Sequence, residues 1–184
     1  AVQYTSAPNA NGTGAATLTL TANDQGNSGS GGGSDVVLGT AGIDIAAVND
    51  APTAEPDIAS TDEDTSFSRN AATGVIDNDT DPDASDVLEV DQIDNGTTTV
   101  GAGTAIAGSD GGEFTINADG SYDFDPSGDF EDLAVGEDRT TSVDYAVADG
   151  NGGTDTTELE VTVDGVNDAP VAAGDTATLV EDGV

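Results

Sequence analysis

A five-residue segment occurs twice in this chain of 184 residues. Val48-Asn49-Asp50-Ala51-Pro52 returns as Val166-Asn167-Asp168-Ala169-Pro170, an offset of 118 residues from position 48 to position 166. The similarity continues on both sides: Asp57 aligns with Asp175, Glu63-Asp64 with Glu181-Asp182, Ile43 with Val161 and Ile45 with Val163. A repeat of this period predicts modules in tandem.

The repeat divides the chain into three parts. Residues 1–51 read as the C-terminal part of one module, 52–169 as a complete module, and 170–184 as the first strand of a following module. With a gap, Leu20-Thr21-Ala22-Asn23-Asp24 also aligns with Tyr145-Ala146-Val147-Ala148-Asp149. The stretch from Gly26 to Ser34 consists mostly of Gly and Ser, which predicts a flexible surface loop inside the first module.

Apolar residues alternate with polar or small ones along several segments. This period of two indicates half-buried strands, and helical spacing is almost absent. Short strands separated by Gly, Asp and Asn turns predict an all-β fold of tandem, Ig-like antiparallel β-sandwich modules. The alternating residues are Leu18 and Leu20, Ile43 and Ile45, Leu88 and Val90, Val143, Tyr145 and Val147, and Leu159, Val161 and Val163.

One hairpin can be predicted in register. A two-residue turn at Asp119-Gly120 would set Ile116 opposite Asp123 and split the apolar face. A three-residue loop, 118–120, instead pairs Ile116 with Tyr122. We therefore expect this loop, with Gly120 in the left-handed conformation.

The charge balance indicates how so thin a core can fold. Only 35% of residues are hydrophobic and 4% are aromatic. The chain has 2 Lys and Arg in total and 37 Asp and Glu, which gives a net charge of −35. Such a chain buries too little apolar surface to offset its entropy unless something else stabilises it. There is no Cys or His, which excludes disulfides and sites built on those ligands, whereas the abundant carboxylate and amide oxygens are ligands for Ca²⁺. We therefore expect Ca²⁺ as the cofactor.

The same composition argues against several classes of function. The negative charge repels nucleic acid and anionic lipid, no apolar run is long enough for a membrane span, and the first residues carry no targeting signal. Without His or Cys, and with seven Phe and Tyr that fall mostly in strand positions, no catalytic constellation or aromatic-lined cleft is evident, and we expect no enzyme activity.

A run of motifs in the complete module resembles the VCBS repeat, one of the cadherin-like modules of giant type I-secreted (RTX) bacterial adhesins. The motifs are Asn117-Ala118-Asp119-Gly120-Ser121-Tyr122-Asp123-Phe124-Asp125-Pro126, Phe130, Leu133, Gly136-Glu137, Val143-Asp144-Tyr145, Asp149-Gly150 and Val163 to Pro170. The resemblance implies a cadherin-like sandwich repeated many times on the bacterial cell surface. It also implies Ca²⁺ at module junctions, adjacent modules of the same chain as partners, and an adhesive domain projected for cell adhesion and biofilm formation.

The densest acidic segment runs from Asp77 to Asp86. Carboxylates at alternate positions of an extended chain repel one another unless a cation lies between them, so Asp79, Asp81 and Asp83 are candidate ligands. The alternative is a solvated acidic loop. The segment is not an EF-hand, because Ala84 and Val90 stand where that loop requires Gly and Glu.

A second candidate site is composite and falls at each module junction. We expect Asn49 and Asp50, at the end of one module, to act with Glu63 and Asp64, just inside the next. The repeat adds Asn167 and Asp168 with Glu181 and Asp182. Asp24 and Asp149, each at a strand end, are further candidates; the alternative is that these are ordinary turn residues.

The predicted function is a calcium-stiffened stalk in a secreted adhesin. Three other functions remain open. The module could bind glycans through calcium, other copies of the chain could be partners in a filament completed by a strand such as 171–180, or the acidity could be an adaptation to high salt.

Overall fold

A computed structural model describes Thr5, Ala7, residues 12–23, 36–170 and 174–176, and Glu181. The predicted loop at 26–34 and most of the predicted strand at 171–180 lie outside these residues. The described residues form eleven strands and one short 3-10 helix, η1. In chain order these are β1 (Gly12–Ala22), β2 (Val36–Ile45), β3 (Asp57–Asp62), β4 (Phe67–Arg69), η1 (Ala71–Thr73), β5 (Glu89–Asp94), β6 (Thr99–Gly101), β7 (Ile106–Ala107), β8 (Glu113–Ile116), β9 (Tyr122–Asp125), β10 (Asp138–Ala148) and β11 (Thr154–Asp164).

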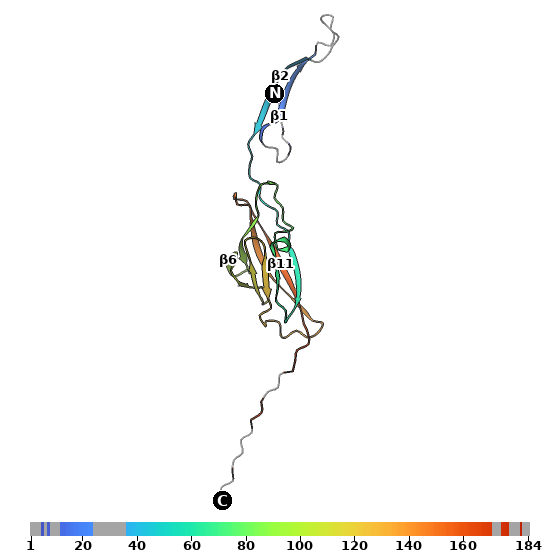
Figure 1. The fold of residues 1–184 in the computed structure, drawn as a ribbon, viewed down its shortest axis with the longest axis vertical. Helices are drawn as coiled ribbons and strands as arrows, with labels where there is room; N and C mark the ends of the chain where they lie inside the picture. The colour runs from blue at the N-terminus through green and yellow to red at the C-terminus, as the bar shows by residue number, and fades with distance from the viewer. Residues whose placement is uncertain are drawn as a thin grey trace.

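Strands β3 to β11 form a sandwich of two sheets. One sheet has the order β3-β11-β10-β5-β6 and the other the order β4-β9-β8-β7. The two sheets share one core (Figure 1). The predicted all-β sandwich is therefore confirmed.

One strand pair departs from the expected antiparallel pattern. β3 runs parallel to β11, with Asp57 opposite Leu159 and Asp62 opposite Asp164. The first and last strands of the module are not joined by a hairpin, so nothing in the connection requires them to be antiparallel. As a result, the chain enters the sandwich at one end and leaves it at the other (Figure 1).

The core follows the period of two that the sequence predicts. The apolar residues of β10 and β11 face inward and lie opposite a cluster of aromatic rings from β8 and β9. The rings of Phe114 and Phe124 are 4.8 Å apart, centroid to centroid. The buried strand residues are Val143, Tyr145, Val147, Leu159, Val161 and Val163, each at most 2% exposed.

The hairpin between β8 and β9 has the predicted register. Ile116 pairs with Tyr122 and Phe114 with Phe124. Gly120 has a φ of 81°, and its N–H donates to the carbonyl of Asn117 at 2.9 Å. These contacts confirm a type I turn closed by a left-handed glycine.

The remaining two strands, β1 and β2, form a separate antiparallel hairpin beyond one end of the sandwich (Figure 1). From Ala16 to Leu20 this hairpin has the same register as β10 and β11, and the pairing shifts by one residue after Leu20. Leu18 and Leu20, which align with core residues of β10, are 46% and 61% exposed here. The pair Leu20 and Gly39 corresponds to the pair Tyr145 and Thr157. The pair Ala16 and Ile43 corresponds to the pair Thr141 and Val161.

Candidate metal centre

Three carboxylates meet in the loop that leads from η1 to β5. Asp81, Asp83 and Asp86 each offer an oxygen, and these oxygens all lie within 4.8 Å of one another. The turn that gathers them is local: the N–H of Asp83 donates to Oδ1 of Asp81 at 2.6 Å, and the N–H of Asp86 donates to the carbonyl of Asp83 at 2.9 Å. We call Asp81, Asp83 and Asp86 the N-end cluster, because it lies where the chain enters the sandwich.

The linker before β3 is bonded to this loop. The N–H of Asp50 donates to Oδ2 of Asp83 at 2.8 Å, and Thr53 forms an isolated antiparallel bridge with Thr80. A shallow depression at this end is lined by linker residues 47–49, by Asp83, Ser85 and Asp86, and by Asn151. The linker and the N-end cluster therefore form one site.

Four buried carboxylate oxygens accept no hydrogen bond within the described part of the chain. Three belong to the acidic loop and are Oδ2 of Asp79, Asp81 and Asp86; the fourth is Oε2 of Glu63. A buried anionic oxygen without a donor is costly, and a cation removes that cost. Hard oxygen ligands gathered in a loop are of the kind that hard divalent cations such as Ca²⁺ accept.

Asp79 does not join the N-end cluster. Its Oδ1 accepts the N–H of Glu55 at 2.8 Å. Burial raises the pKa of Asp79 to about 6, and the negative charges of Asp57, Asp155 and Glu55 add to the rise, against the hydrogen bond from Glu55, which lowers it. The charged form of Asp79 is therefore disfavoured in the folded protein.

This shift predicts how stability depends on pH in the absence of calcium. Because the pKa of Asp79 is higher in the folded state than its ordinary value of 3.8, the folded chain binds the proton more tightly, and unfolding becomes harder as the pH falls through about 6. Thermal melts in a chelator at pH 7 and pH 5 should show a higher melting temperature at pH 5. Asp79→Asn removes this group and should flatten the difference; an unchanged slope in that variant would assign the effect to other carboxylates.

Asp149, a predicted ligand, accepts several hydrogen bonds within the protein. Its side chain is 2% exposed, and its Oδ1 accepts backbone N–H groups of Asn151, Gly152 and Gly153 at 2.7 to 3.0 Å. Its Oδ2 accepts Nδ2 of Asn49 at 2.6 Å. These donors, the Asn49 amide first, lower the pKa of Asp149. The carboxylate thus holds the β10–β11 turn and the linker together.

A second acidic cluster lies at the opposite end of the sandwich. Glu63 is 2% exposed, and its Oε1 accepts the N–H of Val166 at 2.7 Å. The pKa of Glu131 is raised, first by desolvation and then by the charges of Asp168, Asp64 and Glu63. We call Glu63, Asp64, Glu131 and Asp168 the C-end cluster. Asn167 is next to it and donates Nδ2 to the carbonyl of Asp168 at 3.1 Å.

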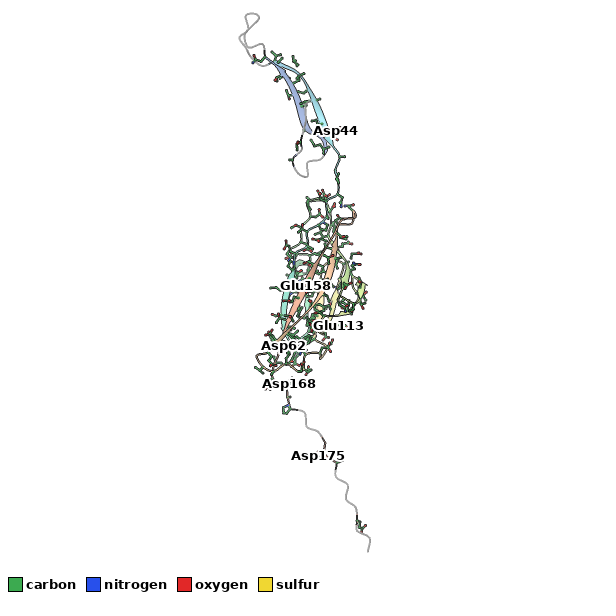
Figure 2. The ribbon with its side chains drawn as sticks, turned by 180° about the vertical axis from the view of Figure 1, so that it is seen from behind. Asp44, Asp62, Glu113, Glu158, Asp168 and Asp175 are labelled. Carbon is green, nitrogen blue, oxygen red and sulfur yellow. The ribbon has the colours of Figure 1, made fainter. Side chains whose placement is uncertain are left out.

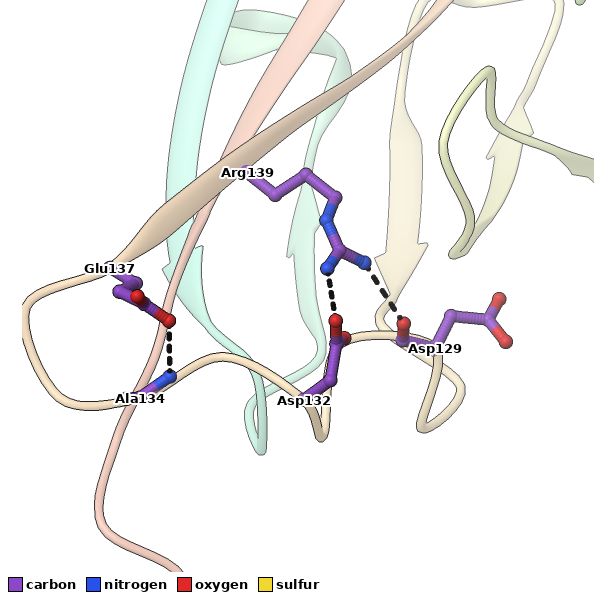
Figure 3. A network of polar contacts seen from close by, with 5 residues as sticks. All are labelled: Asp129, Asp132, Ala134, Glu137 and Arg139. Atoms are coloured by element: carbon purple, nitrogen blue, oxygen red, sulfur yellow. Dashed lines mark hydrogen bonds and ion pairs between the residues drawn. The ribbon is translucent and has the colours of Figure 1, made fainter.

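The loop that carries Glu131 is held in place on both sides (Figure 3). Arg139 donates to Oδ2 of Asp132 at 2.6 Å and to the carbonyl of Asp129 at 3.3 Å. Glu137 accepts the N–H of Ala134 at 3.0 Å. Phe130 and Leu133, on either side of Glu131 and Asp132, are buried. The sequence around Glu131 does not indicate a metal ligand. The fold places Glu131 near Glu63, which is distant in the sequence.

The composite pairing expected from the sequence is wrong for the described residues. Asn49 and Asp50 lie beside the start of β11, whereas Glu63 follows β3 and lies beside the end of β11. The 11 residues of β11 lie between the two sites, and from the first to the last of them the strand spans about 33 Å at a rise of ~3.3 Å per step. Figure 2 shows Asp62 and Asp168 toward the same end of the sandwich. Glu181 is described but exposed and outside any strand, and Asp24 and Asp182 lie outside the described residues.

The chain thus forms a β-sandwich with an acidic cluster at each end and a linker bonded to one of them. The family model of the bacterial cadherin-like domain matches residues 49–165, and the chain belongs to that family. No curated protein matches the chain.

Membership in this family has general consequences. Its domains are generally structural or adhesive modules rather than enzymes, and they typically lie outside the cell. The described residues include no helix long and apolar enough to cross a membrane. The domain is therefore of a kind that serves adhesion or extends a larger protein.

Proposed function

We propose that this chain is part of the stalk of a large secreted bacterial surface adhesin, of the VCBS type, and that Ca²⁺ at module junctions fixes neighbouring modules in line. The observation that carries the proposal is the set of buried carboxylate oxygens without hydrogen-bond donors, present at both ends of one module. At each end they lie close to the Asn-Asp segment that leads to the next module.

At the N-end cluster, the ligands would be the carboxylates of Asp81, Asp83 and Asp86, with Asn49 and Asp50 from the linker. Ca²⁺ takes about six to eight oxygens, and these side chains supply most of them. Since Asn49 and Asp50 belong to the linker, an ion bound here would hold the linker against the sandwich.

At the C-end cluster, the ligands would be Glu63, Glu131 and Asp168, with Asp64 and Asn167 beside them. Among the described residues, Asp81, Asp83 and Asp86 form the group whose oxygens all lie within 4.8 Å of one another, so the C-end carboxylates are gathered less closely. The missing ligands would come from the module that follows, so binding here would join two modules.

We also propose that β1 and β2 are the last hairpin of a preceding module of the same kind. From Ala16 to Leu20 their register matches that of β10 and β11, and Leu18 and Leu20, which align with core residues, are exposed. This assignment supports the module boundaries expected from the repeat, with one module ending near residue 51.

The distance between the β1–β2 hairpin and the sandwich, measured with spin labels, tests whether calcium stiffens the junction. The chain has no cysteine, so Thr19→Cys on β1 and Glu89→Cys on β5 provide two unique positions for spin labels, both exposed. We expect the distance distribution between the labels to narrow when calcium replaces chelator.

The control is the same labelled chain with Asp81→Asn and Asp83→Asn, which should keep a broad distribution in calcium. Magnesium at the same ionic strength should have little effect, because Mg²⁺ demands a stricter geometry and gives up its water reluctantly. A distribution equally broad with calcium and with chelator would refute the stiffening role.

A further inference from the structure

The two strands that lead into and out of the module lie side by side. β3 pairs with β11 over six residue pairs, from Asp57 with Leu159 to Asp62 with Asp164. The pairing is parallel, so the linker arrives at the start of β3 and the chain departs from the end of β11, at opposite ends of the sandwich (Figure 1).

Hydrogen bonds extend this contact beyond both ends of the strand ladder. Before β3, the N–H of Ala54 donates to Oδ2 of Asp155 at 2.9 Å, and Asn49 binds Asp149. After β3, the N–H of Glu63 donates to the carbonyl of Asp164 at 3.0 Å. Oε1 of Glu63 then accepts the N–H of Val166. Together, residues 49–63 are bonded at intervals to residues 149–166, and we call this contact the seam.

A side chain from the middle strand also fixes β3. The hydroxyl of Tyr145, a residue that is 1% exposed, lies 2.7 Å from Oδ2 of Asp57 and 2.8 Å from the carbonyl of Val75. Tyr145 therefore holds the start of β3 against the buried part of the module. The seam is continuous with the core and is not a loosely attached edge.

We propose that the seam is a mechanical clamp that bears tension applied along the chain. A pull on the linker draws β3 toward the entry end, and a pull on the segment after β11 draws β11 the opposite way. Interstrand hydrogen bonds cross between the strands and do not run along them, so this sliding motion loads the six pairs together. A pull that separates the strands from one end would break the same pairs one after another.

The six-pair ladder of β3 and β11 does not depend on calcium, because it is made of backbone hydrogen bonds and contains none of the proposed ligands. It can therefore hold even if the proposed calcium sites fail, and calcium can bind even if the seam is weak. The seam gives the module resistance to unfolding under load, whereas the proposed ions act on the angle between modules.

The test compares two directions of pulling on the same fold. In the sliding geometry, force is applied through Ala51→Cys and Ala169→Cys. In the peeling geometry, it is applied through Ala51→Cys and Asn151→Cys, since residue 151 lies in the β10–β11 turn at the entry end. All three positions are exposed. The full chain would be held by DNA handles in optical tweezers, in chelator throughout.

We expect the module to unfold at a force several times higher in the sliding geometry than in the peeling geometry. In the sliding geometry six residue pairs share the load, whereas in the peeling geometry one pair at a time carries it. Thermal melts of the two variants should agree, which shows that both fold. Equal unfolding forces in the two geometries would overturn the clamp.

A second variant separates the clamp from general stability. Glu63→Ala removes a seam contact at the exit end, so it should lower the unfolding force in the sliding geometry. The unfolding force in the peeling geometry should not change, because it is set by contacts at the entry end. Glu113→Ala, at an exposed position on β8 in the other sheet and outside the seam, should change neither force. A fall of both forces by the same factor in Glu63→Ala would contradict the clamp, because it would reflect only a weaker fold.

Discussion

Calcium added to the metal-free chain is expected to raise the melting temperature of the cadherin-like module by about 10 °C. A dissociation constant of ~10⁻⁴ M is within the range of extracellular calcium modules. Calcium at about 100 times that constant stabilises the folded state by ~2.7 kcal/mol, and each kcal/mol shifts the melting temperature of a domain this size by roughly 4 °C. Calorimetry of the full chain in chelator and in calcium measures the shift directly.

The matched variant is Asp81→Asn with Asp83→Asn, which keeps the side-chain volume and removes two charges from the N-end cluster. In chelator, this variant should melt at a higher temperature than the natural sequence, since the remaining carboxylates repel less. In calcium, it should gain little.

Potassium chloride at the same ionic strength distinguishes ligation from screening. If potassium stabilises the natural chain as much as calcium does, the acidity is an adaptation to salt and the calcium proposal fails.

Gly74→Ala is expected to destabilise the module by roughly 3 kcal/mol or more, as overpacking at a rigid contact does. A Cβ on Gly74 would overlap the carbonyl oxygen of Gly120 and lie 2.6 Å from its carbonyl carbon. That oxygen accepts the N–H of Val75 at 2.9 Å, so the contact joins the start of the acidic loop to the β8–β9 hairpin. Neither backbone can move without breaking this bond.

Gly96→Ala is the control for this prediction. Gly96 has a φ of 83° and open space around it, so alanine there costs only the backbone strain, about 1 kcal/mol. Gly74 has a φ of −88°, which any residue can adopt. Urea denaturation of both variants gives the two free energies of unfolding, and a smaller loss at Gly74 than at Gly96 would rule out the steric explanation.

The elements that could be predicted from the sequence are those that depend on nearby residues. Alternation along β10 and β11 identified the buried face, because successive side chains of a strand point to opposite sides. The β8–β9 register followed from the even spacing of Phe114, Ile116, Tyr122 and Phe124, since only a three-residue loop keeps them on one face.

The site could be predicted only in part, because it depends on which distant segments become neighbours. Asp81 and Asp83 are close in sequence, and the structure places them together. The parallel pairing of β3 with β11 decides that Glu63 lies far from Asn49, and no local pattern reports that pairing.

Asp149 shows the opposite difficulty. An aspartate before glycine suits a metal ligand and a turn equally well in sequence, and only its hydrogen bonds distinguish the two roles.

The distance between the two acidic ends has a consequence for a long array. About 33 Å along β11 is roughly four Debye lengths at physiological ionic strength, where that length is about 8 Å. Charge at one end of a module therefore has almost no effect on occupancy at the other. Filling would then be non-cooperative, and the persistence length of the array would increase gradually as the calcium concentration rises, with no sharp threshold.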